Sequence, residues 1–241
     1  MAIEKEKRAE TSLEFSAVLL MAGQGRRFGS DKLNRRVKGK PLWYYSLKTF
    51  SNVESISRIV LVVRNEVQDI VKHQISGLQN IERISVIAGG EKRGDSVWNA
   101  LVALEQFSPQ WVLIHDCARP LVKTLLIERV MNHLRDGCSS VVPGVELRDT
   151  IKSVRIEGDL RLVDRTLDRA SLMAIQTPQG FDFELIYKAY GLAKEKGLYF
   201  TDDAGYVEWL GEEVFICKGE RDNIKLTYPE DWFWVEEGLT K

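Results

Sequence analysis

Short apolar runs alternate with longer stretches of mixed character along the first part of the chain. Five short, mostly apolar runs predict buried parallel strands. They cover residues 15–21, 59–63, 84–87, 111–114 and 140–142. The stretches at 41–50, 95–107 and 125–134 carry the spacing of helices that bury one face. Pro41 suits the first turn of the first helix, and Asp95 or Ser96 is the predicted N-cap of the second.

Strands that alternate with helices predict a doubly wound α/β fold, with a mostly parallel, Rossmann-like sheet covered on both faces. In such folds ligands bind outside the carboxyl ends of the strands, so chemistry is expected in the segments that follow them. Those segments are polar and contain glycine here. We expect one domain over residues 15–241, preceded by a charged tail at 1–14 that is frayed or partly helical.

The pattern changes at residues 149–169, where apolar and polar positions roughly alternate on both sides of Gly158. This alternation predicts a β-hairpin arm that projects from the main body. An isolated two-stranded hairpin is marginal in water, so its apolar side needs a partner. Either the arm packs on the sheet of its own chain, or it docks on a second copy of the chain.

Beyond the arm, the pattern predicts strands at 173–176 and 214–217 and a helix at 183–194. Thr201 is the predicted N-cap of another helix, whose first turn carries Asp202 and Asp203. Pro229 is placed to open a terminal helix that carries Trp232 and Trp234.

The composition argues against several classes of function. The 241 residues carry 34 Lys+Arg against 35 Asp+Glu, a net charge of -1, which argues against broad binding of nucleic acid or of a membrane surface. No apolar run approaches the ~20 residues that span a bilayer, and residues 1–14 lack the apolar core of a secretory signal. Three widely spaced cysteines without a CxxC pair support neither a disulfide framework nor a zinc cluster, so we expect a cytoplasmic protein.

The segment after the first strand, residues 22–32, combines glycines with Arg26, Arg27 and Lys32. Its glycines let the backbone curl around a phosphate, and three cations in one loop suit a polyphosphate whose charge grows during reaction. The segment is not a dinucleotide fingerprint, because Phe28 stands where the third glycine belongs, and no Gly-Lys-Ser/Thr follows to make a P-loop.

Two further strand ends carry candidate chemistry. Residues 89–96 again place glycines next to a serine, Ser96, that can cap a helix or contact a ligand. Asp116, directly after the fourth strand, is a natural Mg²⁺ ligand beside phosphate-binding loops. We interpret His115 as a hydrogen-bonded structural residue in preference to a general base. No Ser/His/Asp or Cys/His arrangement supports covalent catalysis, so the residues indicate an α/β enzyme that binds a nucleoside polyphosphate and Mg²⁺.

Seven segments together resemble a known family. The first resembles the signature loop of nucleotidylyltransferases that act on sugar and alditol phosphates. The ordered set, from Phe15 to the end of the chain, is similar to the 2-C-methyl-D-erythritol 4-phosphate cytidylyltransferases. The segments begin at Leu20, Gly89, His115, Asp149, Gln176, Thr201 and Asn223 and read LMAGQGRRFG, GGEKRGDSV, HDCARP, DTIK, QTPQGF, TDDA and NIKLT.

The resemblance implies transfer of CMP from CTP to the phosphate of methylerythritol phosphate, with release of pyrophosphate, by in-line attack on the α-phosphorus. It implies a homodimer in which the arm serves the neighbouring active site. Arg27, Lys32, Arg169 and Lys225 would be the catalytic residues. Ala22, Gly23, Gly25, Gly90, Glu91, Ser96, Asp116 and Cys117 would surround the nucleotide, with Asp116 beside Mg²⁺. Arg119, Thr150, Arg169, Thr177 and Thr201 would hold the methylerythritol phosphate.

Three positions depart from the family pattern. Met21 replaces a smaller residue and is expected to face the core. The segment before Lys32 is shortened, which makes Lys38 and Lys40 the alternatives for its role. Cys117 replaces a small residue beside the metal position, where its thiol is expected to narrow the pocket or to react with thiol reagents.

Other functions fit part of the same pattern. A ribitol-5-phosphate cytidylyltransferase would differ mainly in the acceptor. A guanylyltransferase of the molybdenum-cofactor type shares the opening loop, but the segments at Gln176 and Asn223 favour cytidylyl transfer. A catalytically silent nucleotide-binding regulator is the alternative from another class, and the presence of Arg27, Arg169 and Lys225 argues against it.

Overall fold

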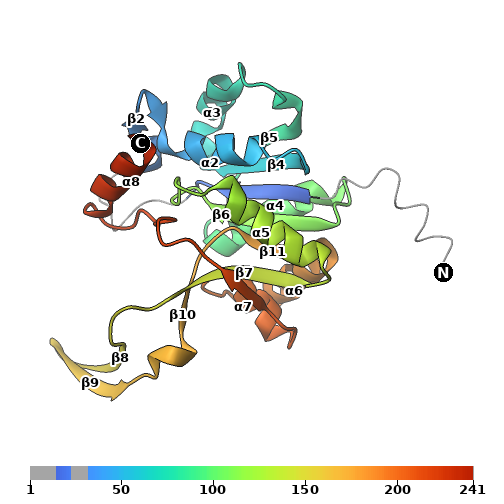
Figure 1. Ribbon diagram of the computed structural model, residues 1–241. Helices are drawn as coiled ribbons and strands as arrows, with labels where there is room; N and C mark the ends of the chain where they lie inside the picture. The colour runs from blue at the N-terminus through green and yellow to red at the C-terminus, as the bar shows by residue number, and fades with distance from the viewer. Residues whose placement is uncertain (1–14, 23–31, 241) are drawn as a thin grey trace, which may run out of the picture.

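The computed structural model describes residues 15–22 and 32–240, with the main chain alone at Lys32. An eight-stranded sheet forms its centre, and the order of the strands across it is β10-β7-β11-β6-β1-β4-β5, with β12 paired to β7 (Figure 1). The strands are β1 (Phe15–Leu20), β4 (Ile56–Val63), β5 (Ile84–Ala88), β6 (Trp111–Asp116), β7 (Ser140–Glu146), β10 (Met173–Ile175), β11 (Gln179–Asp182) and β12 (Phe215–Lys218).

The sheet is mixed but mostly parallel. β1 is parallel to β4 and β6, β4 to β5, and β12 to β7. The short strand β11 lies antiparallel between β6 and β7, and β10 is antiparallel to β7. The five predicted parallel strands and the predicted doubly wound fold are therefore confirmed, whereas β11 was missed.

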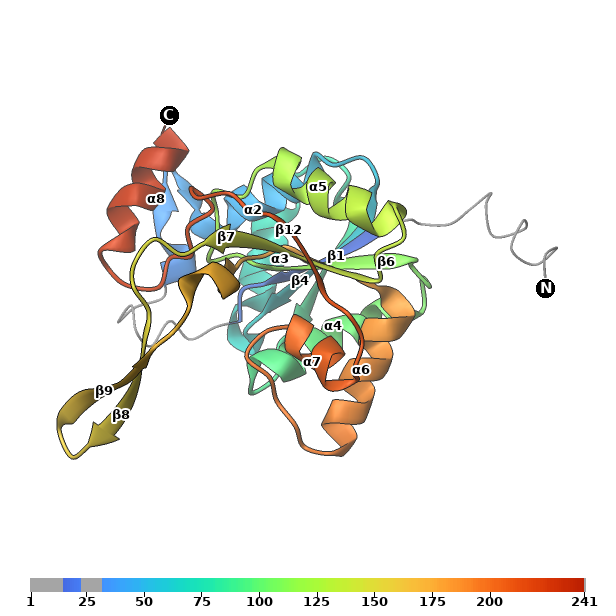
Figure 2. The same cartoon turned by 60° about the horizontal axis from the view of Figure 1, so that its bottom comes forward.

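Helices cover both faces of the sheet (Figure 2). Alternate residues of β1 point to opposite faces, so Ala17 and Leu19 enter one core cluster while Val18 and Leu20 enter the other. The first cluster includes residues of α2 (Leu42–Ser51), α3 (Gln68–Ile75), α5 (Thr124–Arg135) and α8 (Asp231–Thr240). The second includes residues of α4 (Arg93–Glu105), α6 (Phe183–Glu195) and α7 (Ala204–Trp209).

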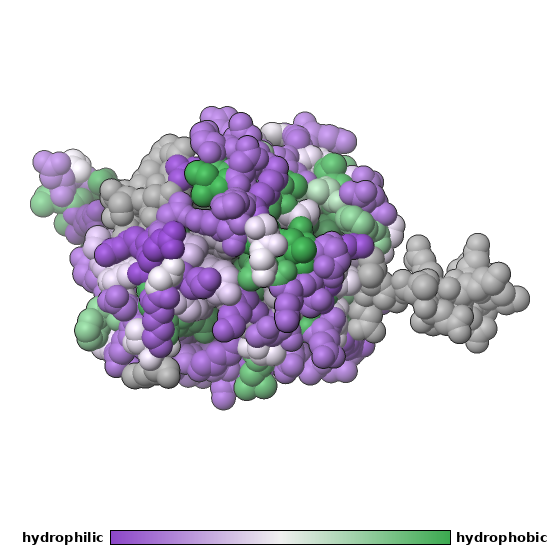
Figure 3. Space-filling view, turned by 90° about the horizontal axis from the view of Figure 1, so that it is seen from above, coloured by the Kyte–Doolittle hydropathy of each residue, from purple (hydrophilic) through white to green (hydrophobic). Residues whose placement is uncertain are grey.

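Shorter elements complete the fold. Strands β2 (Arg36–Val37) and β3 (Lys40–Pro41) pair with each other, and short 3-10 turns lie at Lys32–Asn34, Asn65–Val67, Ile81–Arg83 and Arg169–Ser171. No helix in the described part of the chain is both long and apolar enough to cross a membrane. On the face seen from above, apolar residues form separate patches among polar ones (Figure 3).

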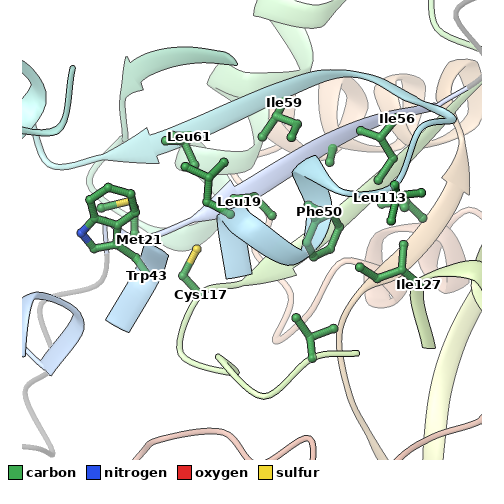
Figure 4. Close-up of a cluster of buried hydrophobic side chains, with 14 of the residues drawn as sticks. Leu19, Met21, Trp43, Phe50, Ile56, Ile59, Leu61, Leu113, Cys117 and Ile127 are labelled. Carbon is green, nitrogen blue, oxygen red and sulfur yellow. The ribbon is translucent and has the colours of Figure 1, made fainter. Parts of the chain in front are cut away.

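The first core cluster extends to the end of β1. Met21 is 7% exposed and lies among these side chains, with Trp43 and Cys117 nearby (Figure 4). The expectation that Met21 faces the core is confirmed. Large buried side chains on α2, including Trp43 and Phe50, anchor this helix against the sheet.

Three helix starts differ from the sequence-based assignment. α4 begins at Arg93 with Lys92 as N-cap, so the prediction of Asp95 or Ser96 was wrong; the Asp95 carboxylate instead accepts the Lys92 N–H at 3.0 Å. α7 begins after Asp203, not Thr201. α8 begins at Asp231, whose carboxylate accepts two backbone N–H groups at 2.7 and 2.8 Å. At α7 the Asp202 carboxylate accepts the Gly205 N–H at 3.2 Å, so at each of the three starts a nearby carboxylate binds backbone N–H groups.

The arm is a hairpin of β8 (Lys152–Glu157) and β9 (Leu160–Thr166), joined by a turn at Gly158 with φ +60°. It forms a two-stranded sheet of its own and projects from the body (Figures 1 and 2). Four apolar side chains on it are 52–73% exposed: Val154, Ile156, Leu160 and Val163. The alternative in which the arm packs on the sheet of its own chain is therefore wrong.

Substitution by alanine should change the free energy of unfolding in opposite directions at Gly180 and at Gly191. A Cβ on Gly180 would lie 2.6 Å from Cγ1 of Val130 and 2.8 Å from Cδ1 of Leu134, both buried. Gly180→Ala should therefore lower the free energy of unfolding by about 1–3 kcal/mol, the usual cost of overpacking. Gly191 lies within α6, and its nearest neighbour would be 3.5 Å away, so Gly191→Ala should raise that free energy by about 0.5–1 kcal/mol. Urea unfolding of both variants measures this, and shifts of the same sign would contradict the packing described.

Candidate active site

The segments after β1 and β5 meet at the carboxyl edge of the sheet. A Cβ on Gly89 would lie 2.7 Å from Cβ of Ala22 and 2.8 Å from Oγ of Ser96, so only glycine fits there. A Cβ on Gly90 would lie 2.3 Å from that of Asp95. The two loops thus form one closely packed surface, along which a ligand can approach the main chain.

Ser96 fixes the shape of this glycine loop. Its buried hydroxyl accepts the Gly90 N–H at 3.1 Å and donates to the carbonyl oxygen of Lys92 at 3.2 Å. Glu91, at the tip of the loop, is exposed to solvent. Ser96 therefore shapes the main chain on which the predicted nucleotide contacts of Gly90 and Glu91 depend.

Asp116 ends β6 and carries the central charge of the site. Its Oδ1 lies 3.2 Å from Nε of Arg93, and its Oδ2 lies 2.5 Å from Nζ of Lys225. Burial disfavours the charged form, but Arg93 and Lys225 outweigh burial and hold the pKa of Asp116 well below its usual range. The carboxylate is thus ionised, and it ties the glycine-loop side of the site to the segment that carries Lys225.

Arg93 also binds a second carboxylate, deeper in the protein. Its Nη1 and Nη2 donate to the two oxygens of Asp203 at 2.8 and 2.7 Å, a bidentate arrangement. The hydroxyl of Tyr190 donates to Oδ1 of Asp203 at 2.6 Å. The pKa of Arg93 lies well above its usual value, because Asp203 and Asp116 together outweigh the effect of burial.

His115 is held on both sides by neutral groups. Its Nδ1 lies 3.0 Å from Oγ1 of Thr177, and its Nε2 lies 3.3 Å from the carbonyl oxygen of Arg119 and 3.4 Å from Oγ of Ser46. Burial, assisted by Arg119, lowers the pKa of His115 to about 3, against the opposing effect of Asp116. A fully buried, neutral histidine with these partners supports the structural interpretation.

Arg119 and Thr177 connect the two halves of the site. Arg119 donates to the carbonyl oxygens of Asn223 at 2.7 Å and of Ile175 at 3.3 Å. The hydroxyl of Thr177 accepts the Asp116 N–H at 3.1 Å, and the Asn223 side chain donates to the Thr177 carbonyl at 2.9 Å. These bonds hold the segment that carries Lys225 against the end of β6.

Cys117 does not lie as expected. Its side chain is fully buried within the first core cluster, close to Met21 and Trp43 (Figure 4). Burial raises the pKa of its thiol far above the usual value, with Asp116 acting in the same direction. The prediction that the Cys117 thiol reacts with thiol reagents is therefore wrong. Its burial also gives no support to contact between the Cys117 side chain and a nucleotide. Its main-chain N–H donates to the Leu20 carbonyl at 3.0 Å.

The structure brings most of the described candidate residues to one edge of the sheet. Those joined there by direct contacts are Ala22, Gly90, Ser96, Asp116, Arg119, Thr177 and Lys225. Thr201 is exposed two residues before Asp203. Gly23, Gly25 and Arg27 lie outside the described residues, as does the side chain of Lys32.

The arm residues lie apart from this group. Thr150 and Arg169 are both exposed, and the Arg169 guanidinium donates to the main-chain oxygen of Arg148. The alternatives for Lys32 have other partners. Lys38 donates to the Thr240 carbonyl at 3.0 Å, and the Lys40 ammonium lies 4.9 Å from the centre of the Tyr44 ring.

Sequence reasoning missed Arg93 and Asp203 as parts of the site. Both stand in motifs that were recognised, Arg93 within the glycine loop and Asp203 within the acidic start of α7. Asp203 was assigned to the first turn of a helix, and Arg93 was given no role. The available signal was a basic and an acidic residue, each in a segment that follows the predicted sheet.

The chain matches one family of known proteins over almost its whole length. Residues 15–241 match the family model described as 2-C-methyl-D-erythritol 4-phosphate cytidylyltransferase. The chain belongs to this family. Among curated family members, the protein of Dictyoglomus thermophilum is 40% identical over 224 residues, which are 93% of this chain and 96% of the relative. The protein of Clostridium beijerinckii is 38% identical over 223 residues, 92% of this chain and 96% of the relative.

Solved structures of family members share the fold. The crystal structure of 4-diphosphocytidyl-2C-methyl-D-erythritol synthase from Anaerococcus prevotii has a TM-score of 0.81 at 31% identity, covering 95% of this chain and 96% of that one. The cytidylyltransferase of Thermus thermophilus has a TM-score of 0.75 at 28% identity, covering 93% and 98%. The family and the fold predicted from the sequence motifs are therefore confirmed.

The neutral, buried His115 predicts a specific loss of stability in acid. The unfolded chain takes up a proton near pH 6.5, whereas the native chain resists protonation down to about pH 3. Stability should therefore fall as the pH drops below 6.5, and the His115 contribution should reach about 2 kcal/mol at pH 5. His115→Gln should remove this part of the pH dependence.

Urea unfolding of the protein without nucleotide, between pH 5 and 7, measures the difference between wild type and His115→Gln. His73→Gln, at an exposed position on α3, is the matched control for a histidine-to-glutamine change. A difference between wild type and His115→Gln that does not vary with pH would contradict the assignment.

Proposed function

We propose that this protein transfers the CMP group of CTP to the phosphate of 2-C-methyl-D-erythritol 4-phosphate and releases pyrophosphate. The observation that carries the proposal is the buried Asp116 carboxylate, shared by Arg93 and Lys225 beside the glycine loop, in a chain of this family. The product, 4-diphosphocytidyl-2-C-methyl-D-erythritol, belongs to the non-mevalonate route to isoprenoids.

The reaction needs no protein nucleophile. The phosphate of the acceptor attacks the α-phosphorus in line, so catalysis depends on positioning and on stabilisation of the charge that develops. Lys225 is 41% exposed at its side chain and stands at the open end of the site, where its ammonium is available to a phosphate. We assign Arg27 and Lys32, from the loop after β1, to the same charge stabilisation. The buried and protonated thiol of Cys117 takes no part.

The nucleotide side of the site consists mainly of main-chain groups. Gly89 and Gly90 are packed so closely that an added Cβ would collide with Ala22 and Ser96 or with Asp95. A base and ribose placed along this edge would lie against the main chain of Gly89 and Gly90, whose shape Ser96 fixes. We assign recognition of the cytidine portion of CTP to this surface, together with Gly23, Gly25 and Glu91.

A magnesium ion fits the site as a companion of the triphosphate. The described residues contain no group of three or more His, Cys, Asp or Glu side chains able to hold a metal by themselves. Asp116 is a single fixed carboxylate, and Mg²⁺ in nucleotide enzymes is often held by one carboxylate together with substrate phosphates. Such an ion would neutralise charge on the phosphates, and Lys225 would then turn from Asp116 to a phosphate.

The acceptor side needs residues from the arm. Arg119, Thr177 and Thr201 lie on the body, whereas Thr150 and Arg169 lie at the base of the arm. Burial against a partner surface would remove the four exposed apolar side chains of the hairpin from water. We propose a homodimer in which the arm of each subunit completes the acceptor site of the other. We also propose a cytoplasmic location, in keeping with three free cysteines.

Pyrophosphate release from purified protein with CTP and Mg²⁺ tests the function. The assay includes methylerythritol phosphate and ribitol 5-phosphate as separate acceptors, and GTP as a competing nucleotide. Rapid release only with CTP and methylerythritol phosphate supports the proposal. Release with ribitol 5-phosphate would assign the alternative acceptor, and binding of CTP without release from any acceptor would indicate a silent regulator.

Mixing two inactive variants tests whether the arm acts across the dimer. Arg169→Ala and Lys225→Ala should each abolish most activity, because each removes a cation from every site. If the sites are shared, a mixed dimer contains one site with both residues intact. After complete exchange of subunits, the mixture should regain roughly a quarter of wild-type activity, since half the dimers are mixed and half their sites are restored.

Subunit exchange is verified by native mass spectrometry with one variant isotopically labelled. Each variant incubated alone is the control. Exchange without any recovery of activity would show that Arg169 and Lys225 serve the same chain's site.

A further inference from the structure

Arg93 is divided unequally between two carboxylates. It makes two short contacts with Asp203, at 2.7 and 2.8 Å, and longer contacts of 3.2 Å with Oδ1 of Asp116. Asp116 lies at the edge where substrates are proposed to bind, whereas Asp203 is 0% exposed. The stronger hold on the arginine therefore comes from a residue that solvent and substrate do not reach.

Asp203 is itself fixed by two neighbouring residues, Tyr190 and Gln179. Its Oδ1 accepts the Tyr190 hydroxyl at 2.6 Å, and the Tyr190 ring stacks on Tyr206 with centroids 3.8 Å apart. The main-chain N–H groups of Asp203 and Ala204 both donate to Oε1 of Gln179, at 3.1 and 3.0 Å. Strand β11 and helix α6 thus hold the carboxylate in one place, and the bidentate pair transmits that placement to Arg93.

The segment around Asp203 also contacts the helix that follows the glycine loop. The Tyr199 hydroxyl donates to Oδ1 of Asp95 at 3.1 Å. A Cβ on Gly94 would lie 2.3 Å from the Tyr206 hydroxyl, so the first turn of α4 and residues 199–206 fit closely. Asp95 in turn lies against Gly90. The position of Asp203 therefore bears on both the glycine loop and Asp116.

We propose that Asp203 is a positioning residue for nucleotide binding, acting through Arg93 on Asp116 and on the first turn of α4. By engaging both terminal nitrogens of the arginine, Asp203 prevents Arg93 from closing fully onto Asp116. The Asp116 carboxylate thus keeps negative charge, which it shares with Lys225 and which would be available to a Mg²⁺ ion that accompanies the triphosphate. This inference rests on the proposed function for the identity of the nucleotide.

Asp203→Asn tests the proposal with little change in size. The asparagine oxygen can still accept the Tyr190 hydroxyl, but the charge that holds Arg93 is lost. The dissociation constant of CTP, measured by calorimetry without acceptor, should rise about tenfold, which corresponds to 1.4 kcal/mol. The KM for CTP should rise in parallel, while kcat changes less than threefold. Tyr190→Phe, which removes one bond to Asp203, should produce a smaller rise.

A double variant separates positioning from mere support of the fold. Arg93→Met with Asp203→Leu replaces this buried pair by apolar side chains and leaves Asp116 with its contact to Lys225. We expect this variant to fold, with a lower unfolding temperature because Asp116 loses one cationic partner, and to bind CTP at least tenfold more weakly. If Asp203→Asn does not fold, the double variant still tests the positioning role of Asp203. Asp69→Asn, which removes an exposed ion pair on α3, is the control for loss of one negative charge.

The outcomes distinguish the two proposals. Wild-type CTP affinity in Asp203→Asn, or in a stable double variant, would overturn the positioning role while leaving the proposed function intact. A wild-type protein that neither binds CTP nor releases pyrophosphate would overturn the proposed function, and the positioning role with it. Weaker CTP binding in both variants, with normal binding by Asp69→Asn, supports the positioning role.

Discussion

Four side chains of alternating charge run from the interior to the open edge of the sheet: Asp203, Arg93, Asp116 and Lys225. Arg93 and Asp116 each have an opposite charge on both sides, and Asp203 has Arg93 and the Tyr190 hydroxyl, which is how ionised groups are tolerated away from water. Removing one partner of such a buried pair commonly costs about 3–5 kcal/mol, because the other charge is left unpaired. The outermost member is the exception, since the Lys225 side chain is 41% exposed; in the proposed reaction it would leave Asp116 for a phosphate.

The sheet explains why these residues meet although they are far apart in the chain. Arg93 follows β5, Asp116 ends β6, and Lys225 follows β12, three strands that run in the same direction as their neighbours β4, β1 and β7. Carboxyl ends of parallel strands lie along one edge, so residues more than a hundred positions apart come within hydrogen-bonding distance. The antiparallel strand β11 adds Thr177, from the turn before it, and Gln179, from its first residue, to the same edge.

Most of the fold was predictable from the sequence, because buried parallel strands appear in it as short, mostly apolar runs. β11 escaped prediction, since Gln179-Gly-Phe-Asp182 is short and shows no apolar run; its burial depends on a glycine that fits under α5. The motifs located the site, and family resemblance gave its residues roles. The link between Arg93 and Asp203 could not be foreseen, because it joins residues 110 positions apart and depends on side-chain direction. Cys117 was misjudged for the same reason: one step along the chain from Asp116 turns the side chain to the opposite face.

The arm has a consequence for how such a protein diversifies. Its two strands pair only with each other, and the main sheet keeps its register without them. Substitutions, insertions or deletions in the hairpin therefore leave the packing of the nucleotide half almost untouched. In the proposed dimer, changes confined to the arm would alter only its share of the acceptor site, so that acceptor preference would be adjusted there without changing the nucleotide half.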